Sequence, residues 1–335
     1  MTGSTAARPR TKFEDEPIAG DRSPDVVVVI LNWNRWDATR ACIESVAASD
    51  YPRRRIVVVD NGSDDPPSAA DVLALGADHF IQTGANLGYA GGNNEGIRIA
   101  LDQRADFVWV LNNDTIVEPG AMSELVAAAA LDPKIGVLTT NVHALDGRVE
   151  TDVAFGGTSR DAPMDFFGTA RVLGCDGSCR VGLHAARAVR GPSLFFRLTA
   201  LRAAGPFDEA YFHYYEEVDL VERLWRTDWR AGLACRSVVS HASGTTLPSM
   251  TGQAIYYLLR NYLRFRRKLF GESVFEVFAR HPVKLPRHVA ATRHTLHGEM
   301  RPVRAHILAL ADAVRGRSGR RSLGDLFQEP FAFEE

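Results

Sequence analysis

The sequence predicts an α/β fold with a mostly parallel sheet, followed by a helical C-terminal extension. Short runs of β-branched and aromatic residues alternate with longer segments of helical periodicity. Several of these runs are apolar throughout, which is typical of strands that are buried on both faces of a sheet. Small polar residues follow the runs directly, at the position where open α/β sheets bind their ligands. We therefore expect a ligand site along the carboxyl ends of the strands.

Composition sets the limits of the domain organisation. The chain has 335 residues, of which 45% are hydrophobic, enough for one large domain or for one domain with an appended piece. Residues 1–23 are polar and mixed in charge, so we expect a disordered leader there. A folded domain is expected over 24–250 and a basic helical extension over 251–335. No apolar run is long enough for a membrane span or a signal peptide, which favours a cytoplasmic protein.

The four cysteines are too few and too scattered for a disulfide framework, which suits a reducing compartment. Cys175 and Cys179 lie four positions apart and near His184, but no fourth zinc ligand stands at a usual spacing. Loop cysteines therefore explain this pair better than a metal site does.

The net charge of −2 hides an uneven distribution. Between Arg260 and Arg321, fifteen Lys or Arg residues accompany only four Asp or Glu residues. Such a segment can attract anionic lipid headgroups or nucleic acid, or it can form solvated helical faces. In the helix expected over 251–271, aromatic residues interleave with cations, which suits a membrane interface. Packing of the aromatic side chains against the domain, with the cations toward water, explains the pattern equally well.

Polar residues collect after the first two expected strands, over residues 25–31 and 55–59, which a helix connects. Because such crossovers are right-handed, both strand ends meet at one edge of a parallel sheet. Asn32 and Asn34 follow the first strand, and Asp60 follows the second. An acid at the end of a second strand often binds a ribose or base, although Asp-Asn-Gly is also a strong turn signal. A dinucleotide site is disfavoured because no G-x-G-x-x-G follows the first strand.

A Gly-rich segment, residues 86–96, follows a third short strand and precedes a helix expected over 97–103. Asn86, Gly88 and Gly91 fall within it. Glycines here remove β-carbons where a loop enters a helix, so that backbone N–H groups can approach a bound anion. A close crossing of the helix over the sheet would require the same glycines, and both interpretations stay open.

The apolar run after Asp106 ends in three small polar residues, Asn112, Asn113 and Asp114, before Pro119-Gly120 begin a helix. Asp114 carries the only full charge at this strand end, and a carboxylate oxygen suits a hard divalent cation. A nucleotide diphosphate could complete the coordination. The alternative is a simple turn that the three residues cap.

Three carboxylates, Glu216, Glu217 and Asp219, follow an aromatic strand expected over 211–215 and lie in the first turn of a helix. The helix dipole stabilises acids at this end, which alone would explain one or two of them. Three acids beside an aromatic segment suggest a chemical role in addition.

Taken together, VVVVILNWNR, IVVVDNGSDD, NLGYAGGNNEG and VWVLNNDTIVEPGAM resemble the motifs of the inverting, metal-dependent family 2 glycosyltransferases, and more narrowly their bacterial rhamnosyltransferase-like branch. The resemblance covers about residues 25–268. It implies the GT-A (nucleotide-diphospho-sugar transferase) fold with a Rossmann-like sheet and a nucleoside diphosphate sugar as donor. The implied donor-binding residues are Asn32, Asn34, Asp60, Asn86, Gly88, Gly91, Asn112 and Asn113.

The resemblance also implies a divalent metal, Mg²⁺ or Mn²⁺. The D-x-D motif of the family corresponds here to Asn112-Asn113-Asp114, in which only the last carboxylate is kept. A His after a late strand of the domain can reach the metal in this family, which makes His241 the second expected ligand beside Asp114. The segment after His241 is expected to form part of a lid over the donor.

For the chemistry, the resemblance assigns the catalytic base to Glu217, with Glu216 and Asp219 as supporting acids and Glu216 as the main rival. An inverting transfer needs a carboxylate that takes the proton of the acceptor hydroxyl. The implied acceptors are a glycan, a polyprenyl-linked saccharide at the inner membrane face, or a small cytosolic molecule, and no nucleic acid is implied. Two other classes of protein stay open. One is a sugar nucleotidyltransferase, although the basic Gly-rich loop of that class is missing after the first strand. The other is a non-catalytic nucleotide-sugar binding protein.

Overall fold

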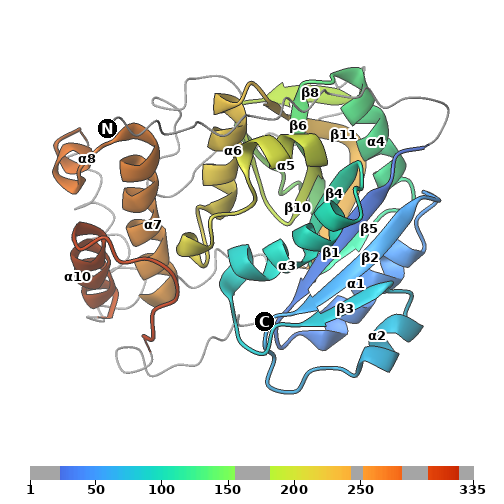
Figure 1. Ribbon diagram of the computed structural model, residues 1–335, viewed down its shortest axis with the longest axis horizontal. Coiled ribbons are helices and arrows are strands. Elements are labelled where there is room, and N and C mark those ends of the chain that lie inside the picture. The colour runs from blue at the N-terminus through green and yellow to red at the C-terminus, as the bar shows by residue number, and fades with distance from the viewer. Residues whose placement is uncertain (1–22, 155–181, 243–251, 281–300, 324–335) are drawn as a thin grey trace, which may run out of the picture.

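The protein, described by a computed structural model over residues 23–154, 182–242, 252–280 and 301–323, is built on one central sheet of nine strands. The strand order is β3-β2-β1-β4-β10-β6-β11-β5, and β8 pairs with β11 (Figure 1). The strands of this sheet are β1 (Val26–Asn32), β2 (Arg54–Asp60), β3 (His79–Gln82), β4 (Phe107–Asn112), β5 (Thr115–Val117), β6 (Ile135–Ala144), β8 (Leu183–Ala186), β10 (Ser193–Arg197) and β11 (Arg230–His241). A separate pair joins β7 (Asp152–Ala154) to β9 (Ala188–Arg190). Of the expected leader, residues 1–22 lie outside the described residues.

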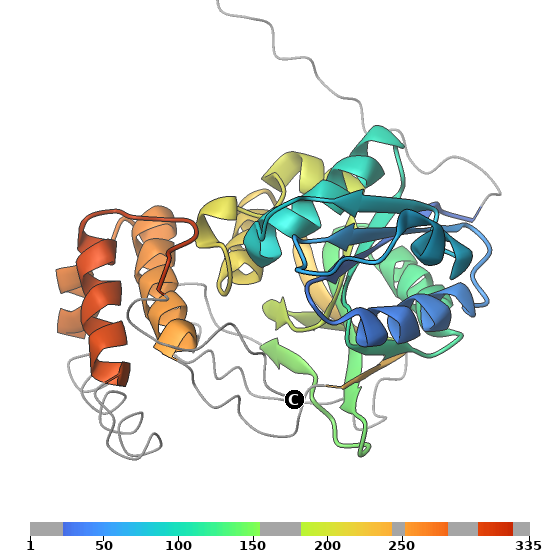
Figure 2. The same ribbon diagram turned by 90° about the horizontal axis from the view of Figure 1, so that it is seen from below.

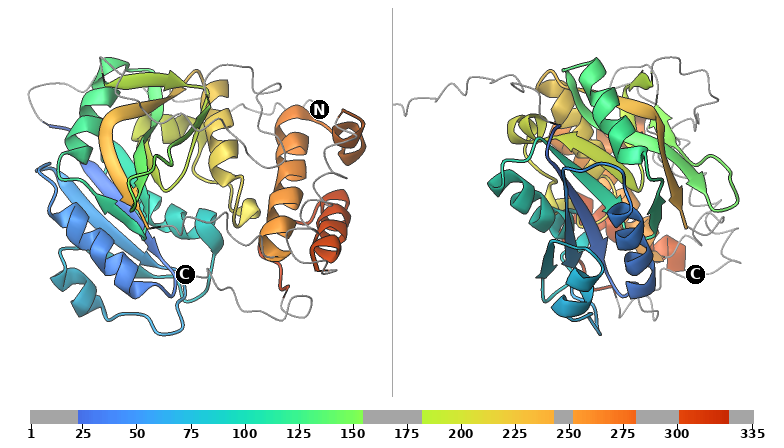
Figure 3. Two further views of the ribbon diagram at one scale, coloured as in Figure 1. Left: turned by 180° about the vertical axis from the view of Figure 1, so that it is seen from behind. Right: turned by 90° about the vertical axis from the view of Figure 1, so that its right-hand side faces the viewer.

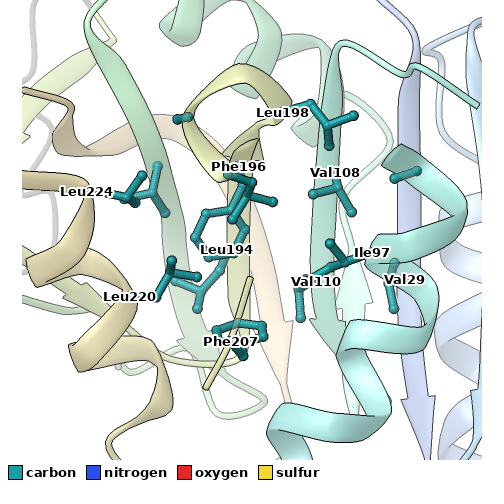
Figure 4. Packing of buried hydrophobic residues seen from close by; sticks show 14 of the residues in the cluster. Val29, Ile97, Val108, Val110, Leu194, Phe196, Leu198, Phe207, Leu220 and Leu224 are labelled. Atoms are coloured by element: carbon teal, nitrogen blue, oxygen red, sulfur yellow. The ribbon is translucent and has the colours of Figure 1, made fainter. Parts of the chain in front are cut away.

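Helices cover both faces of the sheet. They are α1 (Trp36–Ala47), α2 (Ala69–Ala74), α3 (Gly88–Asp102), α4 (Ala121–Leu131), α5 (Leu198–Ala204), η1 (Glu209–Tyr211), α6 (Glu216–Arg226), α7 (Gly252–Phe270), α8 (Val274–Arg280) and α10 (Arg301–Val314). One apolar cluster joins α3, α5 and α6 to one face, and a second joins α1, α2 and α4 to the other. Figure 4 shows the first cluster, in which Ile97 of α3 and Leu220 of α6 flank the side chains of β4 and β10.

The sheet is parallel across β3, β2, β1 and β4 and mixed beyond them, because β10 enters antiparallel between β4 and β6. The expected α/β class is confirmed. Within the parallel half, alternate residues of β1 enter opposite cores, with Val27 in one cluster and Val28 in the other. This explains why the run is apolar throughout. In register, Asn32 lies opposite Asp60, so both strand ends reach the same edge.

The Gly-rich segment belongs to a helix, which corrects the expectation of a loop before residue 97. Helix α3 begins at Gly88 and runs through the glycines. A β-carbon on Gly92 would collide with Leu31, and one on Gly96 would collide with Val29. The helix therefore crosses β1 so closely that only glycine fits at these two positions.

A short strand missed in the sequence, β5, follows the Asn-Asn-Asp turn. It pairs antiparallel with the end of β11, which places His241 opposite Thr115. The helix expected from residue 119 begins slightly later, at Ala121. The extra strand pairing is what brings the C-terminal end of β11 to the turn that contains Asp114.

The aromatic segment before the three carboxylates is also not a strand. It contains the end of the 3₁₀ turn η1, and the non-glycine residues Phe212, Tyr214 and Tyr215 have positive φ angles of 68°, 67° and 74°. The segment therefore reverses direction before α6 begins. An extended conformation, as expected from the aromatic composition, would carry α6 away from the sheet edge.

The C-terminal helices α7, α8 and α10 form a layer beside the end of the sheet domain that carries α6 (Figures 2 and 3). Tyr256 and Tyr257 of α7 are fully buried in an apolar cluster that also contains Tyr211 and Phe212. Packing, the second interpretation left open for these aromatic residues, is therefore correct. No helix among the described residues is long and apolar enough to cross a bilayer.

The cations of α7 do not simply face water. Arg260 is 1% exposed, Arg266 pairs with Glu272 at 2.7 Å, and Lys268 pairs with Asp219. These three cations of α7 thus hold the helix against its neighbours. This corrects the view of α7 as an aromatic face with a solvated basic face.

The cysteines support no metal site within the described residues. Cys42 is buried and free, whereas Cys235 is disulfide-bonded. Cys175 and Cys179 lie outside the described residues. Because at least one disulfide is present, cysteine usage no longer favours a reducing compartment.

Candidate active site

A network of side chains joins the ends of β1 and β2. The Asn32 amide donates to Asp60 Oδ1 at 2.7 Å, and the Ser63 hydroxyl donates to the same carboxylate at 2.5 Å. Thr39 of α1 donates to Asn32 Oδ1 at 2.7 Å, and Asn113 donates to the Thr39 hydroxyl at 2.9 Å. Both Asn32 and Asp60 are buried. Three of the expected donor-binding residues are therefore in one connected network at the sheet edge.

Two further expected donor-binding residues shape the adjoining loops. Asn34 has φ 56° and accepts a hydrogen bond from the Asp64 backbone N–H at 2.8 Å. Asn86 Oδ1 accepts from the Gly88 N–H at 2.8 Å and from the Asn61 amide at 3.2 Å. These bonds link the loops after β1, β2 and β3 to the start of α3.

Glycines at the start of α3 allow close packing against neighbouring segments. Gly88 has φ 77°, and a β-carbon there would collide with the carbonyl group of Phe212. Gly91 packs on Leu87, which a β-carbon would approach to 2.8 Å. The interpretation as a close helix crossing is therefore sound, while a role in donor binding stays a prediction. The approach of Gly88 to Phe212 also joins the donor loops to the segment before α6.

Asp114 and His241 face each other across the β5 and β11 pairing. His241 Nε2 lies 3.1 Å from Asp114 Oδ1, and the Ala242 N–H donates to the Asp114 carbonyl at 2.8 Å. Asn112, the last residue of β4, is held by the hydrogen bond from its N–H to Pro192 O at 2.8 Å. The two expected metal ligands are therefore neighbours.

Electrostatics at this pair favour the charged forms. Burial opposes ionisation of Asp114, but the hydrogen bond and the charge of His241 outweigh it, so the pKa of this carboxyl is lowered. Burial likewise opposes protonation of His241, yet Asp114 and then Glu150 raise its pKa. Glu150 Oε2 lies 3.6 Å from His241 Nδ1, on the far side of the ring. A carboxylate in that place orients an imidazole toward a ligand on its other nitrogen.

The donor set fits a divalent cation that takes its remaining ligands from a diphosphate and water. Asp114 Oδ1 is buried and lies 3.1 Å from His241 Nε2, so the two side chains present an oxygen and a nitrogen at one place. Within the described part of the chain, however, no three His, Cys, Asp or Glu side chains form a group that could hold a metal by themselves. Two protein ligands leave most coordination positions to a bound ligand.

Glu216 and Glu217 open α6, directly after Tyr215, whose backbone is left-handed with φ 74°. Burial, and then the negative charge of Glu217, raise the pKa of Glu216 well above its ordinary value. Glu216 is 3% exposed, and Glu217 is only partly buried. Neighbouring acids in unequal environments are typical of a pair in which one stays protonated and the other acts as a base.

Asp219 has a different environment from the two glutamates. It is fully buried and accepts hydrogen bonds from Tyr211 at 3.1 Å and from Arg223 at 2.7 Å, and Lys268 lies 2.7 Å from it. These partners tie α6 to the segment before it and to α7. Asp219 therefore anchors the helix, and a supporting role in the chemistry stays a prediction.

Tyr89 connects the two groups of acids. Burial raises the pKa of its hydroxyl well above the ordinary value, and the charges of Glu217, Glu216 and Asp114 raise it further, in that order. All three acids therefore lie within electrostatic reach of one side chain at the start of α3. The carboxylate expected to bind the metal and the two glutamates expected at the base position thus all influence the same hydroxyl, although about a hundred residues separate them in sequence.

Three residues of this region were not singled out in the sequence. They are Tyr89, Glu150 and Arg35, an exposed residue before α1 whose charge contributes to lowering the pKa of Asp114. Tyr89 lies inside the Gly-rich motif, so the sequence contains a signal that could have identified it as a residue of the site. Glu150 carried none, because only the folding of the chain brings it to His241.

Comparison with known proteins relates this chain to glycosyltransferases. The profile of Glycosyl transferase family 2 matches residues 27–187. N-acetylglucosaminyl-diphospho-decaprenol L-rhamnosyltransferase of Mycobacterium tuberculosis is 31% identical over 196 residues, which cover 52% of this chain and 62% of the relative. The match thus spans less than two thirds of that relative. The low-salt glycan biosynthesis hexosyltransferase Agl10 of Haloferax volcanii is 24% identical over 258 residues, 75% of this chain and 76% of Agl10.

Solved structures share the fold at low sequence identity. GalNAc-T7, crystallised with UDP, GalNAc and Mn²⁺, matches with a TM-score of 0.55 and 16% identity over 73% of this chain and 48% of its own. Residues 1–349 of S. aureus TarS match with a TM-score of 0.51 and 13% identity over 88% of this chain and 92% of theirs. The expected GT-A architecture is confirmed by these likenesses.

Proposed function

Because this chain belongs to glycosyl transferase family 2, whose profile it matches over residues 27–187, we propose that it transfers a sugar, with inversion, from a nucleoside diphosphate donor to an acceptor hydroxyl. The observation that carries the proposal is that Asp114, Glu216 and Glu217, which come from different elements, all lie within electrostatic reach of the Tyr89 hydroxyl. A binding protein would need no adjacent pair of acids, one buried and one partly exposed, beside its ligand. A sugar transfer would use these acids, because it needs a base near the acceptor hydroxyl and a metal-bound carboxylate near the departing diphosphate, whose negative charge the metal offsets.

The donor would lie along the edge formed by β1, β2 and β4. The network of Asn32, Asp60 and Asn113 offers polar groups to the nucleoside, and the start of α3 with Asn86, Gly88 and Gly91 borders it. Asp114 and His241 would hold Mg²⁺ or Mn²⁺ together with the diphosphate oxygens. A divalent cation there supplies positive charge that offsets the charge of the departing diphosphate. Arg35 adds a cation of the protein on the same side.

Glu217 acts as the base in this proposal. Because Glu216 favours its protonated form, the negative charge of the pair rests on Glu217. Glu217 takes the proton of the acceptor hydroxyl while that oxygen forms a bond to the anomeric carbon. The bond from that carbon to the diphosphate breaks at the same time, and the diphosphate leaves with the electron pair. Attack from the face opposite the leaving group inverts the configuration.

The acceptor is proposed to be a polyprenyl-linked saccharide, with dTDP-rhamnose or a UDP-sugar as donor. The name of the mycobacterial relative, a rhamnosyltransferase that acts on a diphospho-decaprenol, supports this class, and a glycan or small-molecule acceptor is the alternative. The protein would then work at the cytoplasmic membrane face. Since the aromatic residues of α7 are buried, the contact would fall to the exposed Phe275, Ile307 and Val314 and to nearby cations.

A screen of UDP-, dTDP- and GDP-sugars, with Mn²⁺ or Mg²⁺ and without added acceptor, tests the proposal by slow hydrolysis of the donor. We expect one donor class to release its sugar, and Glu217→Gln to reduce the rate about 10³-fold, within the range for loss of a general base. Glu44→Gln, on the exposed side of α1, is the matched control and should keep full activity. Hydrolysis of no donor by the wild-type protein, or full turnover by Glu217→Gln, would overturn the assignment.

A further inference from the structure

We propose that Asn261 of α7, fixed by Arg260, is a positioning residue that sets the orientation of the base Glu217 by holding the backbone of residues 211–214. We call this backbone the base loop. The inference rests on the proposed function, because it assigns to α7 a part in the same transfer reaction. It makes the C-terminal extension a component of the proposed active site.

The base loop has a conformation that its own sequence does not favour. Phe212 and Tyr214, and Tyr215 directly after them, have positive φ angles, a region that bulky side chains rarely adopt. Consecutive residues in this region persist only where the surroundings hold them, and such places are concentrated at functional sites. Glu216 and Glu217 follow at once, so relaxation of the loop would rotate the first turn of α6.

Asn261 supplies the contacts that hold the loop. Its amide nitrogen lies within hydrogen-bond distance of the carbonyl oxygens of Tyr211 at 2.9 Å, His213 at 2.7 Å and Tyr214 at 2.9 Å, so one of its two hydrogens is shared between two of them. Asn261 is fully buried, so water does not compete for these carbonyl groups. One side chain on a helix about 50 residues away in sequence thus holds three of the four residues of the loop.

Arg260 fixes the direction of the Asn261 amide. Its Nε and Nη2 donate to Asn261 Oδ1 at 2.9 Å and 2.8 Å, and Nη2 also donates to Tyr211 O at 2.9 Å. Since a guanidinium has only donors, the oxygen of the amide must face Arg260 and the NH₂ group must face the loop. Arg260 itself is held by Gly319 O at 2.7 Å and lies over the ring of Tyr257.

The opposite side of the loop rests on the donor half of the site. Phe212 lies against Gly88 so closely that a β-carbon on Gly88 would collide with the Phe212 carbonyl group. The Phe212 ring also packs on Tyr257 of α7, with 5.4 Å between ring centroids. The base loop is therefore clamped between the helix that borders the donor and the helix that carries Asn261. A simple docking contact for α7 would not need to reach the carbonyl groups of this particular loop.

The test compares Asn261→Ala with Tyr256→Phe, using the donor that the wild-type protein hydrolyses. Tyr256→Phe removes a buried hydrogen bond of the same helix, to Asp312 at 2.8 Å, and keeps the ring over which Arg260 lies and every hydrogen bond of Asn261 to the loop. We expect Asn261→Ala to lower kcat at least tenfold while the Kd for the nucleoside diphosphate stays within twofold, because a small displacement of a catalytic group is costly. Tyr256→Phe should lower Tm but leave kcat within twofold.

Two results would overturn the proposal. One is a loss of kcat in Asn261→Ala no greater than that in Tyr256→Phe at a similar loss of Tm. The other is a parallel loss of nucleoside diphosphate binding and kcat, which would mean that the whole site had become disordered.

Hydrogen exchange of the wild-type protein tests, without any substitution, whether α7 holds the base loop. The N–H groups of Tyr211, Phe212 and His213 are hydrogen-bonded within their segment and should exchange together with those of α7, if α7 holds the loop. Exchange of the loop about 100-fold faster than α7 would contradict the clamp. If the wild-type protein hydrolyses no sugar nucleotide, the proposed function fails, while this measurement still decides whether α7 holds the loop.

Discussion

The two halves of the active site are held in different ways. In the donor half, Asn32, Asp60 and Ser63 bind one another, and each lies at or just after the end of a parallel strand. In the base half, Glu216 and Glu217 follow a loop with left-handed residues that Asn261 holds from a distant helix. The first half follows from the strand order, whereas the second depends on the docking of the C-terminal extension. We therefore expect the binding of a donor and the activation of an acceptor to be separable in this protein.

The largest expected effect in the donor half comes from Asp114→Asn. It removes the negative charge at the expected metal site while the shape of the side chain is kept, and we expect activity to fall about 10²-fold. Mn²⁺ binding in the presence of nucleoside diphosphate, followed by electron paramagnetic resonance, should weaken in parallel. Unchanged Mn²⁺ binding would show that Asp114 is not a metal ligand. The donor half would then have no assigned carboxylate to hold the cation that offsets the charge of the diphosphate.

Asp60→Asn should act on donor binding and hardly on the chemistry. It keeps a group that can accept hydrogen bonds from Asn32 and Ser63 but loses the charge, and a hydrogen bond to a charged group contributes about 1.5–3 kcal/mol. We expect the KM for the donor to rise about tenfold and kcat to stay within threefold. A fall in kcat with unchanged KM would contradict the separation of the two halves.

Gly88→Ala tests the place where the halves meet. Gly84→Ala is the matched control, since Gly84 has a similar φ of 71° but its β-carbon would meet nothing within 4 Å. We expect the control to lower the free energy of unfolding by about 1 kcal/mol and Gly88→Ala to lower it by at least about 2 kcal/mol, because of the added collision with Phe212. Equal losses in urea unfolding would mean that the contact is unimportant.

The smallest expected effect is the pH dependence caused by Glu216. Its raised pKa means that the folded protein binds more protons than the unfolded chain above the ordinary Glu value of 4.5. Stability contributed by the protonated form is therefore lost as the pH rises through the folded pKa. Glu216→Gln should remove this loss and raise Tm at pH 8 by about 2–4 °C, with little gain at pH 4. An equal Tm difference at both pH values would contradict the assignment.

The donor half could be predicted from the sequence because its causes are local. Apolar runs marked the buried strands, and the crossover rule placed Asn32, Asp60 and Asp114 at one edge. The start of α3 is not predictable in this way, because Gly92 and Gly96 fit a close crossing of the helix over β1 that only the packed sheet reveals.

For the base half, the sequence allows the acidic residues to be predicted but not the conformation of the segment before them. The resemblance pointed to Glu216, Glu217 and Asp219, yet nothing local indicated that the preceding aromatic residues would turn back on themselves. That conformation depends on Asn261, about 50 residues further along. The same is true of Glu150, which reaches His241 only through the folded chain.

The configuration of the anomeric carbon in the product, followed by proton NMR as the sugar leaves the donor, tests the central claim most directly. If Asp114 and Glu217 act on opposite sides of one carbon, a single displacement must give the opposite configuration to that of the donor. Retention of the donor configuration would contradict the account, because it would require a second displacement or an attack from the face of the leaving diphosphate.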